Sequence, residues 1–263
     1  MLSYQHGYHA GNAADVHKHS LLAWVLHYMT QKDKPLSYIE THAGRGLYDL
    51  TDAMAAKTGE AEMGVARLLP RFAPDHPFPR LMAELRAQDG ADAYPGSPVV
   101  AALSLREDDR LHLAELHPQE FSALEANMAQ YGAQCLQQDG LAAAQALCPP
   151  TPRRGLMLID PTYEVKSDYQ KLPKSILQLH RKWNVGVIML WYPILQDGPH
   201  KAMLKPLQSA CPDALTHEVR FSPVRPGHRM IGSGLFVINP PFGLAEAAAD
   251  ITALFQEAYG RPM

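Results

Sequence analysis

The chain has 263 residues, of which 46% are hydrophobic and 19% charged, and its formal net charge is −3. A chain of this size and balance folds around a sizeable core, as one domain or as one domain with an insertion. It has no apolar run long enough for a membrane span, no export signal at the N-terminus, and an odd count of three cysteines, which argues against a disulfide framework. We therefore expect a cytoplasmic globular protein without a membrane partner.

Charge is unevenly distributed along the chain. Residues 153–239 carry 12 Lys and Arg against 6 Asp and Glu, so this block has a net charge of +6 and the remainder −9. A block of this kind suits a polyanionic partner. The alternative is a patchwork of solvated helix faces, because charge along the sequence translates only weakly into charge on one surface.

Strand patterns alternate with helix patterns, which is typical of a mostly parallel sheet with crossover helices. Ser97 before Pro98 and His117 before Pro118 mark two helix starts. In chain order we predict a helix at 13–30, a strand at 36–41, a helix at 98–106, a strand at 110–116, a helix at 118–130, a strand at 133–138, a helix at 140–147, a strand at 155–160, a helix at 169–182, a strand at 185–192, a helix at 199–209, strands at 215–222 and 233–239, and a helix at 244–258.

Residues 50–94 contain no convincing strand and are too long for a plain loop, so a small helical insertion is expected there, within one domain spanning 1–263. No helix pattern fits between the last two strands, which are therefore expected to form an antiparallel hairpin. Five parallel strands followed by such a pair resemble the seven-stranded, Rossmann-like fold of class I S-adenosylmethionine-dependent methyltransferases, an α/β fold.

Ligands of such sheets bind outside the carboxyl ends of the parallel strands. Gly44 and Gly46 follow the first strand and permit a tight turn close to a ligand. Glu115 ends the second strand, where a carboxylate can accept both hydroxyls of a ribose or simply be solvated. Asp139-Gly140 ends the third, where the acid can accept from an adenine amine or cap the next helix.

The fourth strand runs into Asp160-Pro161-Thr162-Tyr163. An exocyclic amine on a purine is a poor nucleophile, because its lone pair is delocalised. Asp160 and the Pro161 carbonyl can each accept one amine hydrogen, and Tyr163 can stack on an extruded base. Asp-Pro is also a common turn, but its place at the fourth strand end favours the functional interpretation.

A second segment, Asn239-Pro240-Pro241-Phe242, spells the Asn/Asp-Pro-Pro-Tyr/Phe motif of amine-directed methyltransferases more closely. It follows the last strand, which runs antiparallel to the others in this fold. Its carboxyl end should therefore lie away from the cofactor. We expect a strand-terminating turn with Asn239 far from the site and Phe242 packed against the core.

The N-terminal string "SYQHGYHAGNAADVHKH" concentrates polar and aromatic groups in front of an apolar helix. Its histidines invite a metal interpretation, but nothing fixes a tetrahedral set and no cysteine is near, so no metal site is expected. The alternative from the residues alone is a capped helix with exposed histidines. The histidines and tyrosine in question are Tyr4, His6, His9, His17 and His19.

These motifs together resemble the RlmJ family, adenine-N6 methyltransferases of 23S ribosomal RNA. The resemblance covers most of the chain and is weakest across the helical insertion. The matching segments are the N-terminal string, "THAGRGLYDL", "YPGSPVVAALSLREDDRLHLAELHP", "DG" at 139–140, "RRGLMLIDPTYE", "LWYPI" and "SGLFVINPP".

The resemblance implies an N-terminal segment over the active site and Asp160 as the catalytic residue. It further implies Tyr4, His6 and Lys18 near the target base, beside Pro161 and Tyr163. The residues implied at the S-adenosylmethionine site are His19, His42, Ser97, Glu115, Asp139, Gly140 and Asp160. The family motif has a second proline where this chain has Thr162, which loses a fixed φ but no hydrogen-bond acceptor.

The expected reaction is direct transfer of a methyl group from S-adenosylmethionine to N6 of a specific adenine in 23S rRNA, without a metal. The expected substrate is naked or early-assembly RNA, and the expected form is a monomer without an obligate protein partner. One alternative is an adenine-N6 methyltransferase of DNA, since the motif does not report the sugar. Another is a non-catalytic nucleic-acid-binding protein linked to the use of external DNA.

Overall fold

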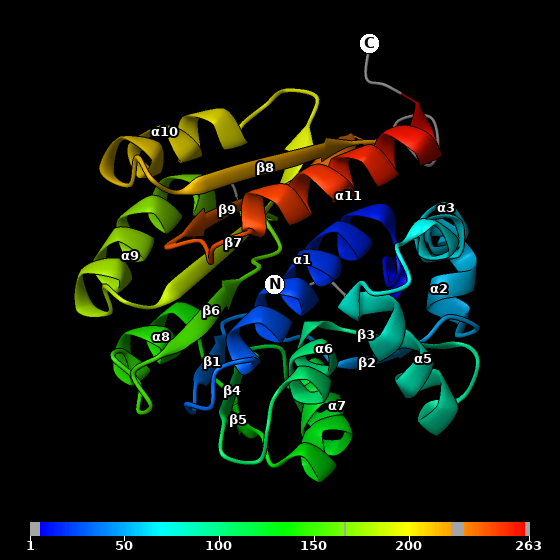
Figure 1. Cartoon of the computed structure of the whole chain (residues 1–263), viewed down its shortest axis with the longest axis horizontal. Helices are drawn as coiled ribbons and strands as arrows, with labels where there is room; N and C mark the ends of the chain where they lie inside the picture. Colours follow the sequence, from blue (N-terminus) through cyan, green and yellow to red (C-terminus); the bar gives the residue numbers. More distant parts are fainter. Residues whose placement is uncertain (1–5, 166, 222–228, 261–263) are drawn as a thin grey trace.

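The computed structural model describes residues 6–165, 167–221 and 229–260. Its centre is a seven-stranded sheet in the order β5-β4-β1-β6-β7-β9-β8 (Figure 1). The first five strands in that order are parallel, and β9 runs antiparallel to both of its neighbours. The strands are β1 Ser37–Glu40, β4 Arg110–Ala114, β5 Gln134–Leu136, β6 Gly155–Ile159, β7 Val187–Leu195, β8 Leu215–Arg220 and β9 Met230–Ile238.

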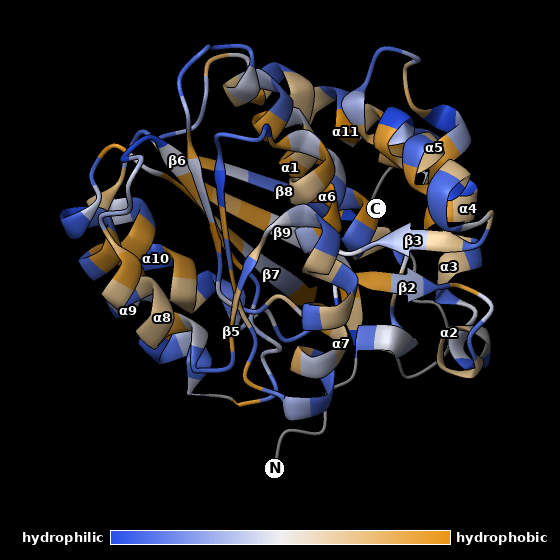
Figure 2. Cartoon of the chain, turned by 90° about the horizontal axis from the view of Figure 1, so that it is seen from below, coloured by the Kyte–Doolittle hydropathy of each residue, from blue (hydrophilic) through white to orange (hydrophobic). Residues whose placement is uncertain are grey.

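Helices cover both faces of the sheet and form a three-layer arrangement (Figures 1 and 2). None of the helices in the described ranges has the length and apolar character needed to cross a membrane. One face carries α1 Ala13–Thr30, α6 Ser97–Ser104, α7 Pro118–Met128 and α11 Leu244–Tyr259, and the other carries α8 Gly140–Leu147, α9 Asp168–Lys182 and α10 His200–Ala210.

Strand β6 shows how the sequence builds these layers. All five of its residues are buried, and they read as one apolar run because both faces are covered. Leu156 and Leu158 join the hydrophobic cluster under α1, whereas Met157 and Ile159 join the cluster under α9 and α10. The period of two along a strand therefore supplies both cores from one segment.

The predicted sheet layout is confirmed, including the antiparallel last strand. The limits of several elements differ from the prediction. Strand β7 extends to Leu195 and β9 begins at Met230, because the two pair with each other beyond the end of β6. Ser97 does not cap α6; Gly96 takes the cap position, and the Ser97 hydroxyl instead donates to the buried carboxyl group of Glu40 at the end of β1.

Four α-helices and a 3-10 helix, Leu69–Arg71, fill the segment predicted as an insertion, but the expectation that it contains no strand is wrong at its end. β2 Leu47–Asp49 and β3 Ala93–Pro95 form a two-stranded antiparallel ribbon. Three residues per strand are too few to show an alternating pattern. The helices between them are α2 Ala53–Thr58, α3 Glu60–Met63, α4 Val65–Leu68 and α5 Pro77–Asp89. We propose that 50–94 is an inserted part of a single domain, which the ribbon closing its two ends supports.

The segment at 239–242 lies at the amino edge of the parallel strands, as the strand direction predicts. Ile238 pairs with Ile188 near the start of β7. The Asn239 amide donates to the carbonyls of Asn184 and Gly186 at 2.9 and 2.8 Å. The expectation that Phe242 packs against the core is wrong, because its side chain is 88% exposed in the turn before α11.

Candidate active site

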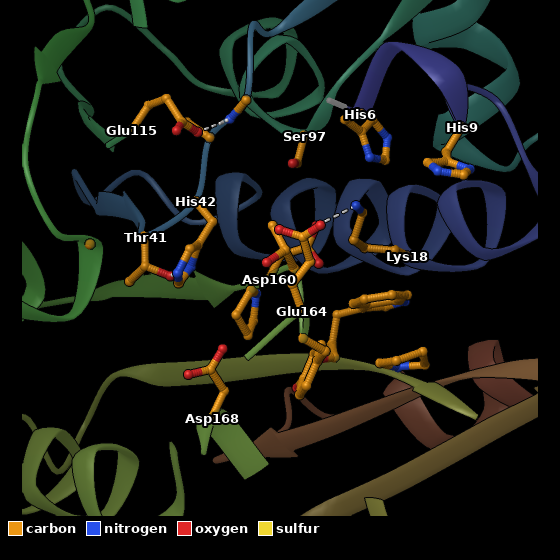
Figure 3. Close-up of a pocket in the computed structure, with 18 of the residues that line it drawn as sticks. His6, His9, Lys18, Thr41, His42, Ser97, Glu115, Asp160, Glu164 and Asp168 are labelled. Carbon is orange, nitrogen blue, oxygen red and sulfur yellow. Dashed lines mark hydrogen bonds and ion pairs between the residues drawn. The ribbon is translucent and has the colours of Figure 1, made fainter. Parts of the chain in front are cut away.

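A cavity of about 510 Å³ opens at the carboxyl edge of the parallel strands. Asp160 lies near its middle, with Thr41 and His42 on one side and Lys18 and His6 on the other (Figure 3). Of the residues implied by the sequence, only Tyr4 lies outside the described residues. The rest all line this cavity: His6, Lys18, Pro161, Tyr163, His19, His42, Ser97, Glu115, Asp139, Gly140 and Asp160.

The turn after β1 forms one wall of the cavity. Gly44 and Gly46 have φ angles of 61° and 79°, in the left-handed region that favours glycine. A Cβ on Gly44 would meet the Tyr48 hydroxyl at 2.8 Å. Glu115 joins this turn to the end of β4, because its carboxylate accepts from the Gly44 amide at 2.8 Å and from the His117 amide at 2.7 Å.

Two further groups lie on the same side. The His42 ring contacts the Thr41 hydroxyl at 2.7 Å, and burial lowers the pKa of His42. Asp139 caps α8 by accepting from the Ala142 amide at 2.8 Å. Both of the alternatives for Asp139 are therefore compatible with its position, since it is an N-cap that also lines the cavity.

Asp160 follows β6 and forms an ion pair with Lys18 of α1, with Oδ2 and Nζ 2.5 Å apart. The same ammonium lies 3.2 Å from Oδ1 of Asp15, one helical turn before it. Burial alone would lower the pKa of Lys18, but the two carboxylates raise it above its ordinary value. The cavity therefore contains a lysine held in its charged form between two acids.

Asp15 was not identified from the sequence, although it organises the N-terminal segment. Its side chain is 3% exposed and accepts from the His6 ring at 2.8 Å and from the Gly11 amide at 3.1 Å. Burial would raise the pKa of Asp15, but His6 and Lys18 hold it well below its ordinary value. One buried carboxylate thus links the segment before α1 to the lysine beside Asp160.

The inserted helices also touch this segment. The carboxylate of Glu60, in α3, accepts from the side-chain amide of Asn12 at 3.1 Å and lies 3.0 Å from the His9 ring. Val65 donates its backbone amide to the Gly11 carbonyl at 2.8 Å. The insertion therefore supports the loop that places His6 at the cavity.

His19 and Ser97 lie deeper in the wall. Burial lowers the pKa of His19 to about 3, and its Nδ1 lies 3.0 Å from the Tyr94 hydroxyl. Its Nε2 is buried without a hydrogen-bond partner among the described residues. The Ser97 hydroxyl donates to the Glu40 carboxyl, which is buried at the end of β1.

The apolar wall of the cavity was also missed. It is formed by Trp191, Pro193 and Leu195 of β7 with Met230 of β9. The segment "LWYPIL" carries the signal, because alternate residues of a strand face one side. This wall could be recognised only once the structure showed that β7 continues beyond the end of β6.

The described basic residues of the block at 153–239 lie at more than one edge of the sheet. The Arg154 guanidinium, just before β6, donates to the carbonyls of Met29 and Lys34 at the amino edge of the sheet. Lys182 donates to the carbonyl of Gln145. Lys171, in contrast, lines the cavity at the opposite edge.

Among the described residues, no cluster of three or more His, Cys, Asp or Glu suits a metal ion.

Comparison with known proteins shows the family to which the sequence is similar. Residues 33–262 match the family described as "Ribosomal RNA large subunit methyltransferase D, RlmJ". Ribosomal RNA large subunit methyltransferase J of Escherichia coli (strain K12) is 38% identical over 95% of this chain and 91% of its own length. The protein of the same name from Haemophilus influenzae is 35% identical over 95% of this chain and 92% of its own.

A solved structure shows the same fold. Protein LPL1258 of Legionella pneumophila, assigned to family DUF519, superposes with a TM-score of 0.86 at 32% identity, covering 96% of this chain and 94% of that one. The chain belongs to the RlmJ family of ribosomal RNA large subunit methyltransferases, with the class I fold and the cofactor S-adenosylmethionine.

Proposed function

We propose that the protein transfers a methyl group from S-adenosylmethionine to N6 of a specific adenine in 23S rRNA. Its family accounts for the coarser activity, methylation of ribosomal RNA. The observation that carries the finer proposal is the position of Asp160-Pro161-Thr162-Tyr163. This tetrapeptide follows the fourth parallel strand and shares one cavity with the Gly44 turn and Glu115.

The residues present suit the cofactor. Glu115 and Asp139 offer carboxylate oxygens for hydroxyl and amine donors at two neighbouring strand ends. Gly44 has a positive φ, and a Cβ there would meet the Tyr48 hydroxyl, so glycine lets the backbone of this turn come close to a ligand. His19 lines the same cavity, and its buried Nε2 makes no hydrogen bond among the described residues, which leaves that nitrogen for a bound ligand.

The cofactor supplies an electrophilic methyl group. The task of the chain is to hold an adenine amine in line with that methyl and to favour its lone pair. Oδ2 of Asp160 is paired with Lys18, whereas Oδ1 makes no described hydrogen bond and is available to accept from the amine. Pro161 also lines the cavity, and we assign the role of second acceptor to its carbonyl.

Thr162 does not change this set of acceptors. Its side chain is exposed at the rim of the cavity, between the buried residues Pro161 and Tyr163. The Tyr163 hydroxyl donates to the Trp191 carbonyl at 2.7 Å, which fixes the loop from its other end. This bond offsets part of the stiffness that a second proline would give.

The test is replacement of Asp160 by Ala and by Asn. Both variants are expected to lose formation of N6-methyladenosine in 23S rRNA purified from a strain lacking the enzyme, as measured by nucleoside mass spectrometry. Turnover equal to wild type in either correctly folded variant would overturn the assignment. Parallel assays with duplex DNA carrying the same sequence discriminate the RNA reaction from a DNA reaction.

We propose a cytoplasmic monomer that acts on naked or early-assembly 23S rRNA. The support is that one chain supplies every described wall of the cavity. Methylation of protein-free RNA compared with that of assembled subunits, and the mass of the enzyme in solution by light scattering, test these two points.

A further inference from the structure

Strand β7 creates a wall that extends past the end of β6. Ile159 of β6 pairs with Leu190, and beyond that point β7 pairs with β9 alone. Side chains at alternate positions face the same side of a strand. Trp191 is the first residue past β6 on the side of α1. Because Ile159 pairs with Leu190, the next residues along the two strands are Asp160 and Trp191, and both line the cavity.

The indole of Trp191 has a defined place relative to the ion pair. The Lys18 ammonium lies 5.6 Å from the centroid of the ring, close enough for a cation–π contact. The ring of Tyr163 meets it edge-on, with centroids 6.0 Å apart. Tyr163 is only 9% exposed, whereas Trp191 is partly exposed to the cavity. The indole therefore offers more aromatic surface to a ligand here than the tyrosine does.

A buried chain of hydrogen bonds holds this indole from behind. Trp191 Nε1 donates to the Ser233 hydroxyl at 2.9 Å, and that hydroxyl lies 2.8 Å from Nδ1 of His17. Nε2 of His17 lies 2.9 Å from Nδ1 of His217, whose Nε2 lies 2.8 Å from the hydroxyl of Thr252. We call the set Ser233, His17, His217 and Thr252 the histidine relay.

Only one direction of hydrogen-bond donation gives every proton of the histidine relay a described acceptor. Burial lowers the pKa of His217 to about 4 and holds that of His17 well below its ordinary value, so both rings are neutral near pH 7. If Ser233 accepts from the indole, its own proton is donated to His17, which donates to His217, which donates to Thr252. The reverse direction would leave the Ser233 proton without a described acceptor.

We propose that Trp191 is the platform on which the target base stacks while its amine meets Asp160, and that the histidine relay holds the indole in that position. The inference rests on the proposed adenine reaction. It also gives His17, one of the N-terminal histidines, a role: His17 acts through Ser233 on the orientation of Trp191 and does not touch the base. His17 and Ser233 are thus positioning residues.

The platform is tested with Trp191→Ala and Trp191→Phe, with Trp24→Phe as the matched control. Trp24 stacks on Tyr28 of α1 outside the cavity. Loss of base stacking is expected to lower kcat/KM for RNA about ten- to hundredfold in Trp191→Ala and less in Trp191→Phe, which keeps a ring. The affinity for S-adenosylmethionine, measured by calorimetry, should stay within about twofold of wild type.

Fluorescence keeps the test valid if Trp191→Ala folds poorly. A stem-loop RNA containing the target adenine, added with S-adenosylhomocysteine, should quench the emission of the wild type and of Trp24→Phe. The quench should be absent in Trp191→Phe. An unchanged KM and kcat in both Trp191 variants, or an undiminished quench in Trp191→Phe, would overturn the platform.

The histidine relay is tested by a double-mutant cycle between Ser233→Ala and Trp191→Phe. If Ser233 acts through the indole, its replacement lowers kcat/KM for RNA in the wild type but has no further effect once the N–H is gone. A purely structural role predicts a lower Tm with unchanged kcat/KM, or additive losses, and either result refutes the relay. Product analysis of the wild type separates the two proposals: another methylated nucleoside contradicts the adenine reaction, whereas N6-methyladenosine with unaffected Trp191 variants contradicts the platform alone.

Discussion

Lys18 and Asp160, 142 residues apart in the sequence, form a buried ion pair with Nζ and Oδ2 2.5 Å apart. The same ammonium also contacts Asp15, so one charge serves two carboxylates. All three side chains are at most 13% exposed. Charges withdrawn from water in this way stabilise a fold only while each keeps its partner.

Lys18→Met is therefore expected to destabilise the protein by about 3–5 kcal/mol, because it leaves two buried carboxylates without their cation. Methylation should be lost as well. The loss of stability should be largest between neutral pH and the ordinary lysine pKa of 10.5. It should be smaller in mild acid, where a proton can replace the missing ammonium, and should also shrink above pH 10.5, where the unfolded wild type no longer carries the Lys18 charge. Urea denaturation across a pH series measures this.

The matched control is Lys201→Met, which removes an exposed lysine from α10. Its free energy of unfolding should change by no more than about 0.5 kcal/mol. If Lys18→Met proves as mild as this control, the ion pair contributes nothing measurable to the fold.

Asp15→Asn tests the link between the N-terminal segment and Asp160. The amide keeps the shape of the side chain and can still accept from the His6 ring, but it no longer holds the Lys18 ammonium by charge. We expect kcat to fall on the order of tenfold to a hundredfold, because Lys18 and the segment before α1 lose their common anchor. Single-turnover methylation separates this effect from RNA binding.

The same variant has a definite pH signature. The folded pKa of Asp15 lies well below its ordinary value of 3.8, so the ionised carboxylate stabilises the folded state above that value. As the pH falls through the folded pKa, this contribution is lost. The stability difference between wild type and Asp15→Asn should therefore be constant near neutrality and shrink in strong acid, and a constant difference throughout would contradict the ion-pair account.

Glu40 presents the opposite case. Its carboxyl is fully buried and accepts from the Tyr38 and Ser97 hydroxyls at 2.8 and 2.5 Å, and burial raises its pKa from 4.5 to about 8. A carboxyl with a raised folded pKa binds its proton more tightly in the folded state. The stability of the wild type should therefore fall as the pH rises from 4.5 to about 8.

Glu40→Gln removes this titration while keeping the shape of the side chain. The variant should gain on the wild type as the pH rises across that interval, by at most about 1.4 kcal/mol per pH unit. Guanidinium denaturation of both proteins at matched pH values checks the slope. A difference in stability that does not vary with pH would show that Glu40 does not titrate there.

The sequence was sufficient to locate Glu115, Asp139 and Asp160, because each ends a parallel strand and such ends meet at one edge of a sheet. The strand pattern was strong where both faces are buried, as in β6. It was weak for the ribbon of β2 and β3, whose strands are too short to show a period.

Contacts between distant segments could not be predicted from the sequence. In the sequence, Asp15 looks like an ordinary acid in the first turn of a helix. Its importance depends on the contact of its neighbour Lys18 with Asp160, which lies on another element. Trp191 reads as one more apolar residue of a buried strand, until the pairing of β7 with β9 shows where β6 stops. The family resemblance supplied the N-terminal residues that composition and spacing could not.

The two proline motifs allow a final comparison within one chain. Asn239 has a φ of 54° and its amide donates to two carbonyls at the amino edge of the sheet, away from the cavity. Asn239→Ala should lower the free energy of unfolding by about 1–3 kcal/mol, through two lost hydrogen bonds and a strained φ. Methylation per folded molecule should equal that of wild type.

Asn239→Gly is the matched variant, because glycine adopts the positive φ without strain and loses only the two hydrogen bonds. It should therefore be more stable than Asn239→Ala by up to about 1 kcal/mol, with the same activity. Asp160→Asn should show the converse, with methylation lost. Thermal melts and initial rates on the same preparations compare the three. If Asn239→Ala loses methylation while remaining folded, strand direction does not decide which motif carries the chemistry.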